Sequence, residues 1–86
     1  MFHNSFMSNR RQYEIFCHLL VEARQKKGFK QSDLAGKLGR HQSYISKYET
    51  GERRLDVIEF LDVCYALSIK PESILKQMRS GKDKEE

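Results

Sequence analysis

Apolar residues recur at intervals of three and four along most of the chain, and long alternating runs of β-branched residues are absent. This spacing is typical of amphipathic α-helices, and it predicts an all-α domain of five helices. The expected helices span about Asn9–Lys27, Gln31–Leu38, Gln42–Thr50, residues 57–67, and a short last segment that begins at Pro71.

Helix-end signals support these bounds. Gly28 and Gly39 follow the first two helices and supply the left-handed conformation that often ends a helix. Asp56 and Glu59 have the spacing of a capping box, in which each side chain accepts from the other residue's backbone N–H. Pro71 fits the first position of a helix, where its missing N–H has no intrahelical partner to lose.

The same periodicity gives the expected core. The inward positions of the first four helices are Phe16, Leu19, Leu20, Ala23, Leu34, Ala35, Leu38, Ile45, Tyr48, Val57, Phe60, Leu61, Cys64 and Leu67. The fifth helix adds an apolar face made of Ile74, Leu75 and Met78.

The length of 86 residues allows one domain. We expect a flexible N-terminal extension at residues 1–8, the folded domain at 9–79 and a disordered charged tail at 80–86. Met7 is an alternative translation start.

Charge is unevenly distributed. The chain carries a formal net charge of +4, but residues 24–54 hold nine basic and three acidic residues, a net of +6, and residues 55–76 net −2. A basic segment of this kind fits either a polyanion-binding surface or a solvated face with chance clustering, and charge alone does not separate the two.

Composition also excludes several classes of protein. Cys17 and Cys64 are isolated, so reduced thiols and a cytoplasmic location are expected, without a disulfide framework. No apolar run approaches the length of about 20 residues that spans a membrane. The scattered histidines predict no metal site, and no nucleophile–base pattern supports a catalytic site, so we expect neither an enzyme nor a cofactor.

Several residues fall into the register of a helix-turn-helix. Gln31 opens one short helix, the small Ala35 allows close crossing, Gly39 forms the turn and Ile45 anchors the next helix. The outward face of that next helix then consists of Gln42, Ser43, Ser46 and Lys47.

In these positions the sequence resembles the lambda-repressor-like (XRE, Cro/repressor-type) helix-turn-helix family. The matching stretches are KQSDLAGKLG at 30–39, QSYISKYETGERR at 42–54 and ALSIKPESIL at 66–75. The resemblance covers about Leu19 to Leu75, and it implies a five-helix DNA-binding domain whose helix at about 42–50 enters the major groove.

The resemblance also assigns roles by position. It implies that Gln42, Ser43 and Lys47 contact base edges, which suits the hydrogen-bonding groups of their side chains. It implies contacts to the DNA backbone for Gln31, Lys30, His41, Ser46, Thr50, Arg53 and Arg54, and Tyr44 either packs at the edge of the core or touches a phosphate.

Arg24 and Glu49 stand where the family often has a structural ion pair between the first and third helices. Some positions depart from the family pattern. Lys30 and His41 replace the usual Ser or Thr caps, Ser68 replaces a C-terminal Gly, and Gly36 weakens the second helix.

The sequence therefore predicts a sequence-specific transcriptional regulator that binds double-stranded DNA. A homodimer on a palindromic site is expected, because one module contacts only a few base pairs. The fifth helix, with Ile74, Leu75 and Met78, is the expected contributor to the dimer interface. The alternative is an antitoxin or another partner-binding module on the same fold. No membrane contact is expected, and no small-molecule effector is indicated.

Overall fold

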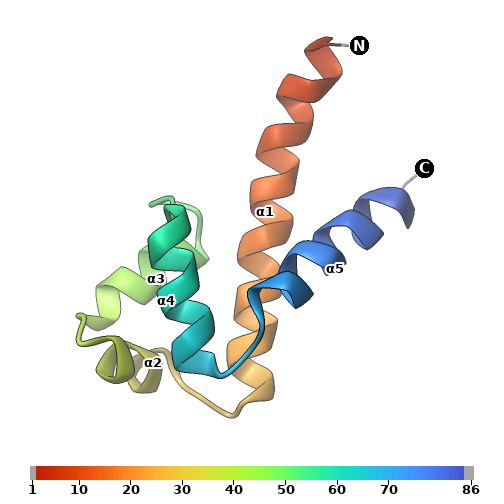
Figure 1. The fold of residues 1–86 in the computed structure, drawn as a ribbon. Helices are drawn as coiled ribbons and strands as arrows, with labels where there is room; N and C mark the ends of the chain where they lie inside the picture. Colours follow the sequence, from red (N-terminus) through yellow and green to blue (C-terminus); the bar gives the residue numbers. More distant parts are fainter. Residues whose placement is uncertain (1, 85–86) are drawn as a thin grey trace.

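A computed structural model describes the backbone of residues 2–84 and the side chains of residues 9–79. Five α-helices account for most of it, and no strand occurs within the described backbone: α1 Phe2–Lys26, α2 Gln31–Leu38, α3 Gln42–Glu49, α4 Val57–Leu67 and α5 Pro71–Lys84. In Figure 1, α2, α3 and α4 gather beside the lower half of α1, and α5 crosses α1 on the way to the C-terminus. The predicted all-α class is confirmed.

The two outer helices are longer than the sequence predicts. α1 begins at Phe2 rather than near Asn9, and α5 continues to Lys84 rather than ending near Arg79. Adding a residue to an existing helix costs little once a packed segment has nucleated it, and no proline interrupts either end. The flexibility predicted for residues 1–8 and the disorder predicted for residues 80–86 remain predictions, and their side chains lie outside the described part of the chain.

The ends of the inner helices follow local chemistry. Gly39 adopts the left-handed conformation at φ 66° after α2, as its position in the turn predicts. Before α4, the Asp56 carboxylate accepts from the Glu59 N–H at 2.8 Å, and the Glu59 carboxylate accepts from the Asp56 N–H at 3.0 Å. The predicted capping box is therefore confirmed. Ser68 ends α4 in the left-handed conformation at φ 57°, a place where glycine costs less.

The core lies where α1, α2, α3, α4 and the start of α5 meet. Its buried members are Leu20, Leu34, Ala35, Ile45, Tyr48, Phe60, Val63, Cys64, Leu67 and Ile74. Aromatic contact continues this core toward α1, since the rings of Phe16 and Phe60 lie 5.1 Å apart.

Two core predictions on α4 are wrong, and one core residue of this helix was not predicted. Val57 and Leu61 are 69% and 42% exposed, although both were expected to point inward, and Val63 is fully buried instead. The reason is that α4 is apolar on more than one side, so periodicity does not identify which side faces the core. On α5, Ile74 is only 2% exposed and belongs to the core, so it is not available to a dimer interface.

None of the helices, within the residues that the structure describes, has the length and apolar character needed to cross a membrane.

Candidate nucleic-acid interface

The α2–turn–α3 unit packs on the core through apolar side chains on one side. Leu34 and Ile45 are completely buried, and Ala35 is 3% exposed. The N–H groups of Gly39 and Arg40 return to the carbonyls of Gly36 and Ala35, which fixes the turn between the helices. The opposite side of the unit is polar and faces solvent.

The predicted base-contacting residues lie on that solvent side. Gln42, Ser43 and Lys47 are all exposed, within the first two turns of α3. No neighbouring element of the described chain covers them, so they are available to a ligand as large as DNA. Thr50 is exposed at the end of α3 and donates through its hydroxyl to the Lys47 carbonyl at 3.1 Å.

A chain of hydrogen bonds connects the core to this surface. Arg24 is buried and makes a bidentate pair with Glu49, with Nε–Oε2 and Nη2–Oε1 distances of 2.7 and 3.1 Å. Arg24 also donates from Nη1 to the Phe29 carbonyl at 2.7 Å. Glu49 accepts from Nε2 of Gln31 at 2.9 Å, and Oε1 of Gln31 accepts from Nε2 of Gln42 at 3.1 Å. The family resemblance implied the Arg24–Glu49 pair, and the structure extends it to two glutamines.

The direction of this chain follows from its ends. Arg24 only donates, and the Glu49 carboxylate only accepts, so Gln31 must turn its NH₂ toward Glu49 and its oxygen toward Gln42. Gln42 therefore donates to Gln31 with one N–H. Its second N–H and its oxygen remain on the exposed side.

The helix N-termini are capped differently from the expectation. His41 is the N-cap of α3: its Nδ1 accepts from the Ser43 N–H at 3.3 Å. His41 departs from the usual Ser or Thr, yet it still caps α3, because an unprotonated ring nitrogen accepts as a hydroxyl oxygen does. At α2, the Lys30 ammonium has no acceptor to offer, and Asp33 instead accepts from the Lys30 backbone N–H at 2.8 Å.

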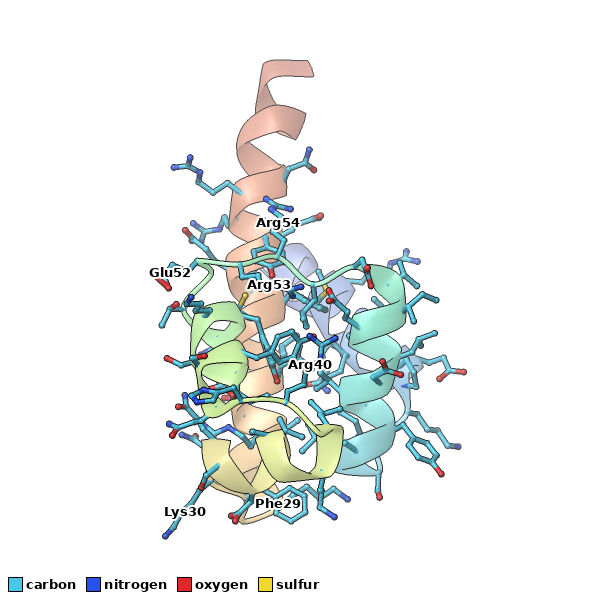
Figure 2. The ribbon with its side chains drawn as sticks, turned by 90° about the vertical axis from the view of Figure 1, so that its left-hand side faces the viewer. Phe29, Lys30, Arg40, Glu52, Arg53 and Arg54 are labelled. Atoms are coloured by element: carbon cyan, nitrogen blue, oxygen red, sulfur yellow. The ribbon has the colours of Figure 1, made fainter. Side chains whose placement is uncertain are left out.

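Tyr44 lies between two guanidinium groups. The Cζ atoms of Arg40 and Arg53 lie 4.3 and 4.8 Å from the centre of its ring. Figure 2 labels both arginines. The partial burial of this ring raises the pKa of the Tyr44 hydroxyl. Tyr44 thus packs partly against the core, and it holds two cations beside α3.

Arg53 is itself paired. Its Nη2 and Nη1 donate to Oε2 and Oε1 of Glu59 at 2.8 and 3.2 Å. The Arg53 guanidinium, followed by the Asp56 N–H, lowers the pKa of the Glu59 carboxyl to about 2. Arg53 was predicted as a DNA-backbone contact, and in the DNA-free chain its charge is already balanced by a carboxylate. Sequence reasoning used Glu59 only as a capping residue.

Tyr13 organises the loop that follows α3. Its hydroxyl donates to the Arg53 carbonyl at 3.2 Å and accepts from the Leu55 N–H at 3.1 Å. Arg54 stacks on the Tyr13 ring, with Cζ 4.4 Å from its centre, and is exposed. Sequence reasoning missed Tyr13, whose partners are 40 and 42 positions away in the sequence. It also missed Arg40, which contacts Tyr44 of α3 from the turn before that helix.

The cysteines and histidines do not gather. Cys17 and Cys64 are free and buried, and burial raises the pKa of the Cys64 thiol to about 11. Across the described residues, no three His, Cys, Asp or Glu side chains come together in a way that could hold a metal ion.

Comparison with known proteins agrees with this geometry. The helix-turn-helix family model matches residues 20–74, which include the whole α2–turn–α3 unit. An XRE-family like protein from Pseudomonas syringae pv. tomato is 40% identical, with a TM-score of 0.84 over 90% of this chain and 94% of that one. This chain belongs to the XRE-type helix-turn-helix family.

Two further solved structures are restriction-modification controller proteins. C.AhdI from Aeromonas hydrophila is 32% identical, with a TM-score of 0.67 over 72% of this XRE-type chain and 94% of that one. C.Esp1396I has a TM-score of 0.77 over 85% of this chain and 95% of that one, but at 22% identity it supports the fold alone. No curated protein matches the chain. The family is one of DNA-binding regulators, so a DNA-binding role is the functional class of this protein.

Proposed function

We propose that this protein is a sequence-specific transcriptional regulator that inserts α3 into the major groove of double-stranded DNA. The observation that carries the proposal is the orientation of Gln42. Its free oxygen and second N–H form an acceptor–donor pair on the exposed side of α3, next to exposed Ser43 and Lys47. Adenine presents the complementary pattern in the major groove, with its N6 amino donor and N7 acceptor.

The charged residues around α3 also favour an approach of DNA to the exposed side of this helix. Lys30, Lys47 and Arg54 are exposed around α2 and α3, and Gln31 keeps one N–H for a phosphate. We propose that Lys30, Gln31, Ser46, Thr50 and Arg54 contact the DNA backbone. Arg53 joins them after exchanging Glu59 for a phosphate. His41 and Tyr44 position neighbouring groups at the same edge.

A single copy of α3 is too short to give a regulator enough sequence specificity. A single α3 covers a few base pairs, and two copies on half-sites about 34 Å apart provide the usual specificity. We therefore propose a homodimer on a palindromic operator in the cytoplasm.

The test is selection of bound DNA from a random pool, followed by affinity measurements with variants. Wild type should enrich a palindrome with an adenine in each half-site. Gln42→Ala should lose about 1–3 kcal/mol on that sequence and little on a sequence changed at the same base pair. Arg54→Ala is the matched control, because removing a backbone contact should weaken binding to all sequences and reduce its salt dependence. A Gln42→Ala variant with wild-type affinity and preference would contradict the base-contact assignment.

A further inference from the structure

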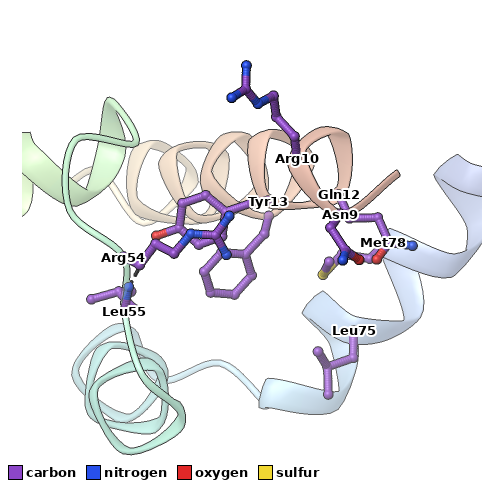
Figure 3. Close-up of a pocket in the computed structure, with 9 residues that line it drawn as sticks. Asn9, Arg10, Gln12, Tyr13, Arg54, Leu55, Leu75 and Met78 are labelled. Atoms are coloured by element: carbon purple, nitrogen blue, oxygen red, sulfur yellow. Dashed lines mark hydrogen bonds between the residues drawn. The ribbon is translucent and has the colours of Figure 1, made fainter. Parts of the chain in front are cut away.

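An open groove lies between α1, the loop before α4, and α5. Its volume is about 610 Å³, and Figure 3 draws the residues that line it. In this view α1 carries Tyr13, the loop carries Arg54 and Leu55, and α5 carries Leu75 and Met78. Pockets that bind small organic molecules commonly measure about 300–1,000 Å³. We call this feature the α1–α5 groove, and its size suits such a ligand.

The lining of the groove is largely apolar, and part of it is held by the core. The rings of Tyr13 and Phe16 lie 5.5 Å apart, and Phe16 in turn lies 5.1 Å from the ring of Phe60. On the opposite side Leu75 is 50% exposed, and Met78 has a flexible thioether that adapts to the shape of a ligand. An alkyl chain in the groove would therefore lose contact with water against aromatic and aliphatic side chains.

The charge around the groove favours an anion. The exposed guanidinium of Arg54 lies 4.4 Å from the centre of the Tyr13 ring and has no ion-pair partner among residues 9–79. Arg53, by contrast, is already held by Glu59. Arg10 also lines the groove, but Figure 3 shows it pointing away from the other labelled side chains. Because no acidic residue of the described chain lines the groove, Arg54 is free to pair with a ligand carboxylate.

The groove shares two residues with the proposed DNA surface. The Tyr13 hydroxyl, which donates to the Arg53 carbonyl and accepts from the Leu55 N–H, fixes the loop that presents Arg54. Arg54 is one of the proposed contacts to the DNA backbone. A guanidinium that forms a bidentate pair with a carboxylate has fewer donors left for a phosphate. An anion in the groove would therefore compete with DNA for Arg54.

We propose that the α1–α5 groove binds a small amphipathic carboxylate and that this ligand weakens DNA binding. The alkyl chain lies against Phe16, Leu75 and Met78, and the carboxylate pairs with Arg54. The regulatory step rests on the proposed function, whereas ligand binding does not. The sequence indicated no small-molecule effector, because the lining comes from three separate segments that only folding brings together.

Calorimetric titration of the full chain with decanoate, below the concentration at which it forms micelles, tests ligand binding without DNA. Binding should saturate at one molecule per chain, and each methylene removed from the ligand should weaken it about fourfold. Decyltrimethylammonium has the same alkyl chain and the opposite charge, and it should bind about tenfold more weakly or less tightly still. Equal affinity for the two amphiphiles would contradict the role of Arg54 and overturn the proposal.

Variants locate the ligand. Leu75→Glu places a like charge in the groove and should weaken decanoate binding about tenfold or more. Arg54→Gln should weaken it about fivefold, as expected for an exposed ion pair. Val57→Glu is the matched control, because Val57 is an exposed apolar residue that does not line the groove. Circular dichroism should show that all these variants remain helical, since each changes an exposed position.

Methyl NMR and sedimentation decide between a ligand and a second copy of the chain. Decanoate should shift the methyl signals of Leu55 and Met78 and leave those of the core residue Leu34 unchanged. If decanoate causes no such shifts, and Leu75→Glu instead dissociates a wild-type dimer, the groove is an interface between copies and the proposal is wrong.

Fluorescence anisotropy with a selected operator duplex tests the regulatory step. Saturating decanoate should weaken DNA binding by wild type about as much as Arg54→Gln does, and it should have little effect on DNA binding by Arg54→Gln. Lys47→Gln removes a cation of α3 that does not line the groove, so this variant should bind decanoate like wild type and DNA more weakly. Decanoate that occupies the groove without changing DNA affinity would refute the regulatory step. A chain that binds decanoate but no DNA would support the groove and refute the proposed function instead.

Discussion

The molecule contains two bidentate Arg–Glu pairs that differ in their surroundings. Arg24 and Glu49 join α1 to α3, and their side chains are only 9% and 5% exposed. Arg53 and Glu59 join the loop after α3 to α4, and their side chains are 39% and 16% exposed. The chemistry is the same, so differences in behaviour must come from burial and from the other groups that each pair contacts.

Burial makes the first pair a fixed support. A buried ion that loses its partner keeps the cost of removal from water, so neither residue of the pair is free to move away. Through hydrogen bonds, the fixed Glu49 carboxylate orients the Gln31 amide, and Gln31 in turn orients Gln42 at the surface. The second pair is bordered by solvent. A phosphate that approaches Arg53 can therefore take the place of the Glu59 carboxylate without leaving the guanidinium buried and unpaired. One pair therefore orients Gln42, the proposed base-contacting residue, and we propose that the other holds a cation available to the DNA backbone.

The largest expected effect comes from breaking the buried pair. Glu49→Ala should lower the free energy of unfolding by about 3–5 kcal/mol, because it leaves the Arg24 guanidinium buried without its carboxylate. Urea denaturation followed by circular dichroism measures this. A loss no larger than that of an exposed Glu52→Ala control would mean that the Arg24 charge is hydrated in the folded chain.

A smaller change in the free energy of unfolding is expected where a buried polar group has no hydrogen-bond partner. Tyr48 is completely buried, and its hydroxyl has no hydrogen-bond partner among the described residues. Tyr48→Phe should raise the free energy of unfolding by about 1 kcal/mol, because an unpaired hydroxyl returns to water only on unfolding.

Tyr13→Phe provides the matched control. The Tyr13 hydroxyl makes two hydrogen bonds to the loop before α4. Its removal should lower the free energy of unfolding by about 1 kcal/mol, opposite in sign to the effect at Tyr48. If both variants shift stability in the same direction, hydrogen bonding does not distinguish the two tyrosines.

The sequence predicted the helices that carry these ion pairs better than it predicted the contacts that the paired side chains make. The bounds of α2 and the Asp56–Glu59 capping box depend on neighbouring residues, and local chemistry determined them. The second partner of Glu59 could not be predicted, because Arg53 precedes α4 in a loop whose path is set by Tyr13, 40 residues away in sequence. Likewise, the register assigned Gln31 and Gln42 separate roles on successive helices, and only the folded position of Glu49 shows that they touch and which way their amides point.

The exposed pair should influence DNA binding more than folding. Glu59→Gln removes the carboxylate charge that competes with phosphate for Arg53. We expect tighter binding at low salt and a salt dependence steeper by about one unit in the slope of log K against log salt. Fluorescence anisotropy with a fixed operator duplex measures both quantities. Asp62→Asn, an exposed change on the same helix away from Arg53, should leave both unchanged. A Glu59→Gln slope and affinity equal to wild type would mean that Glu59 does not compete with phosphate for Arg53.

The pH dependence of folding separates the two roles of Glu59. The pKa of its carboxyl falls from an ordinary value of 4.5 to about 2 in the folded chain, chiefly through Arg53. A lowered pKa means that the unfolded chain binds the proton more readily, so the stabilisation is fully present above pH 4.5. It should decline as the pH falls from about 4.5 toward 2.

Urea midpoints measured across this range should therefore decline less steeply for Glu59→Gln than for wild type, and the two curves should converge at the acid end. Arg53→Gln gives the complementary measurement, because it removes the main cause of the pKa shift and keeps the carboxylate that caps α4. If Arg53→Gln retains the wild-type slope, the Asp56 N–H rather than the ion pair holds the pKa of Glu59 down.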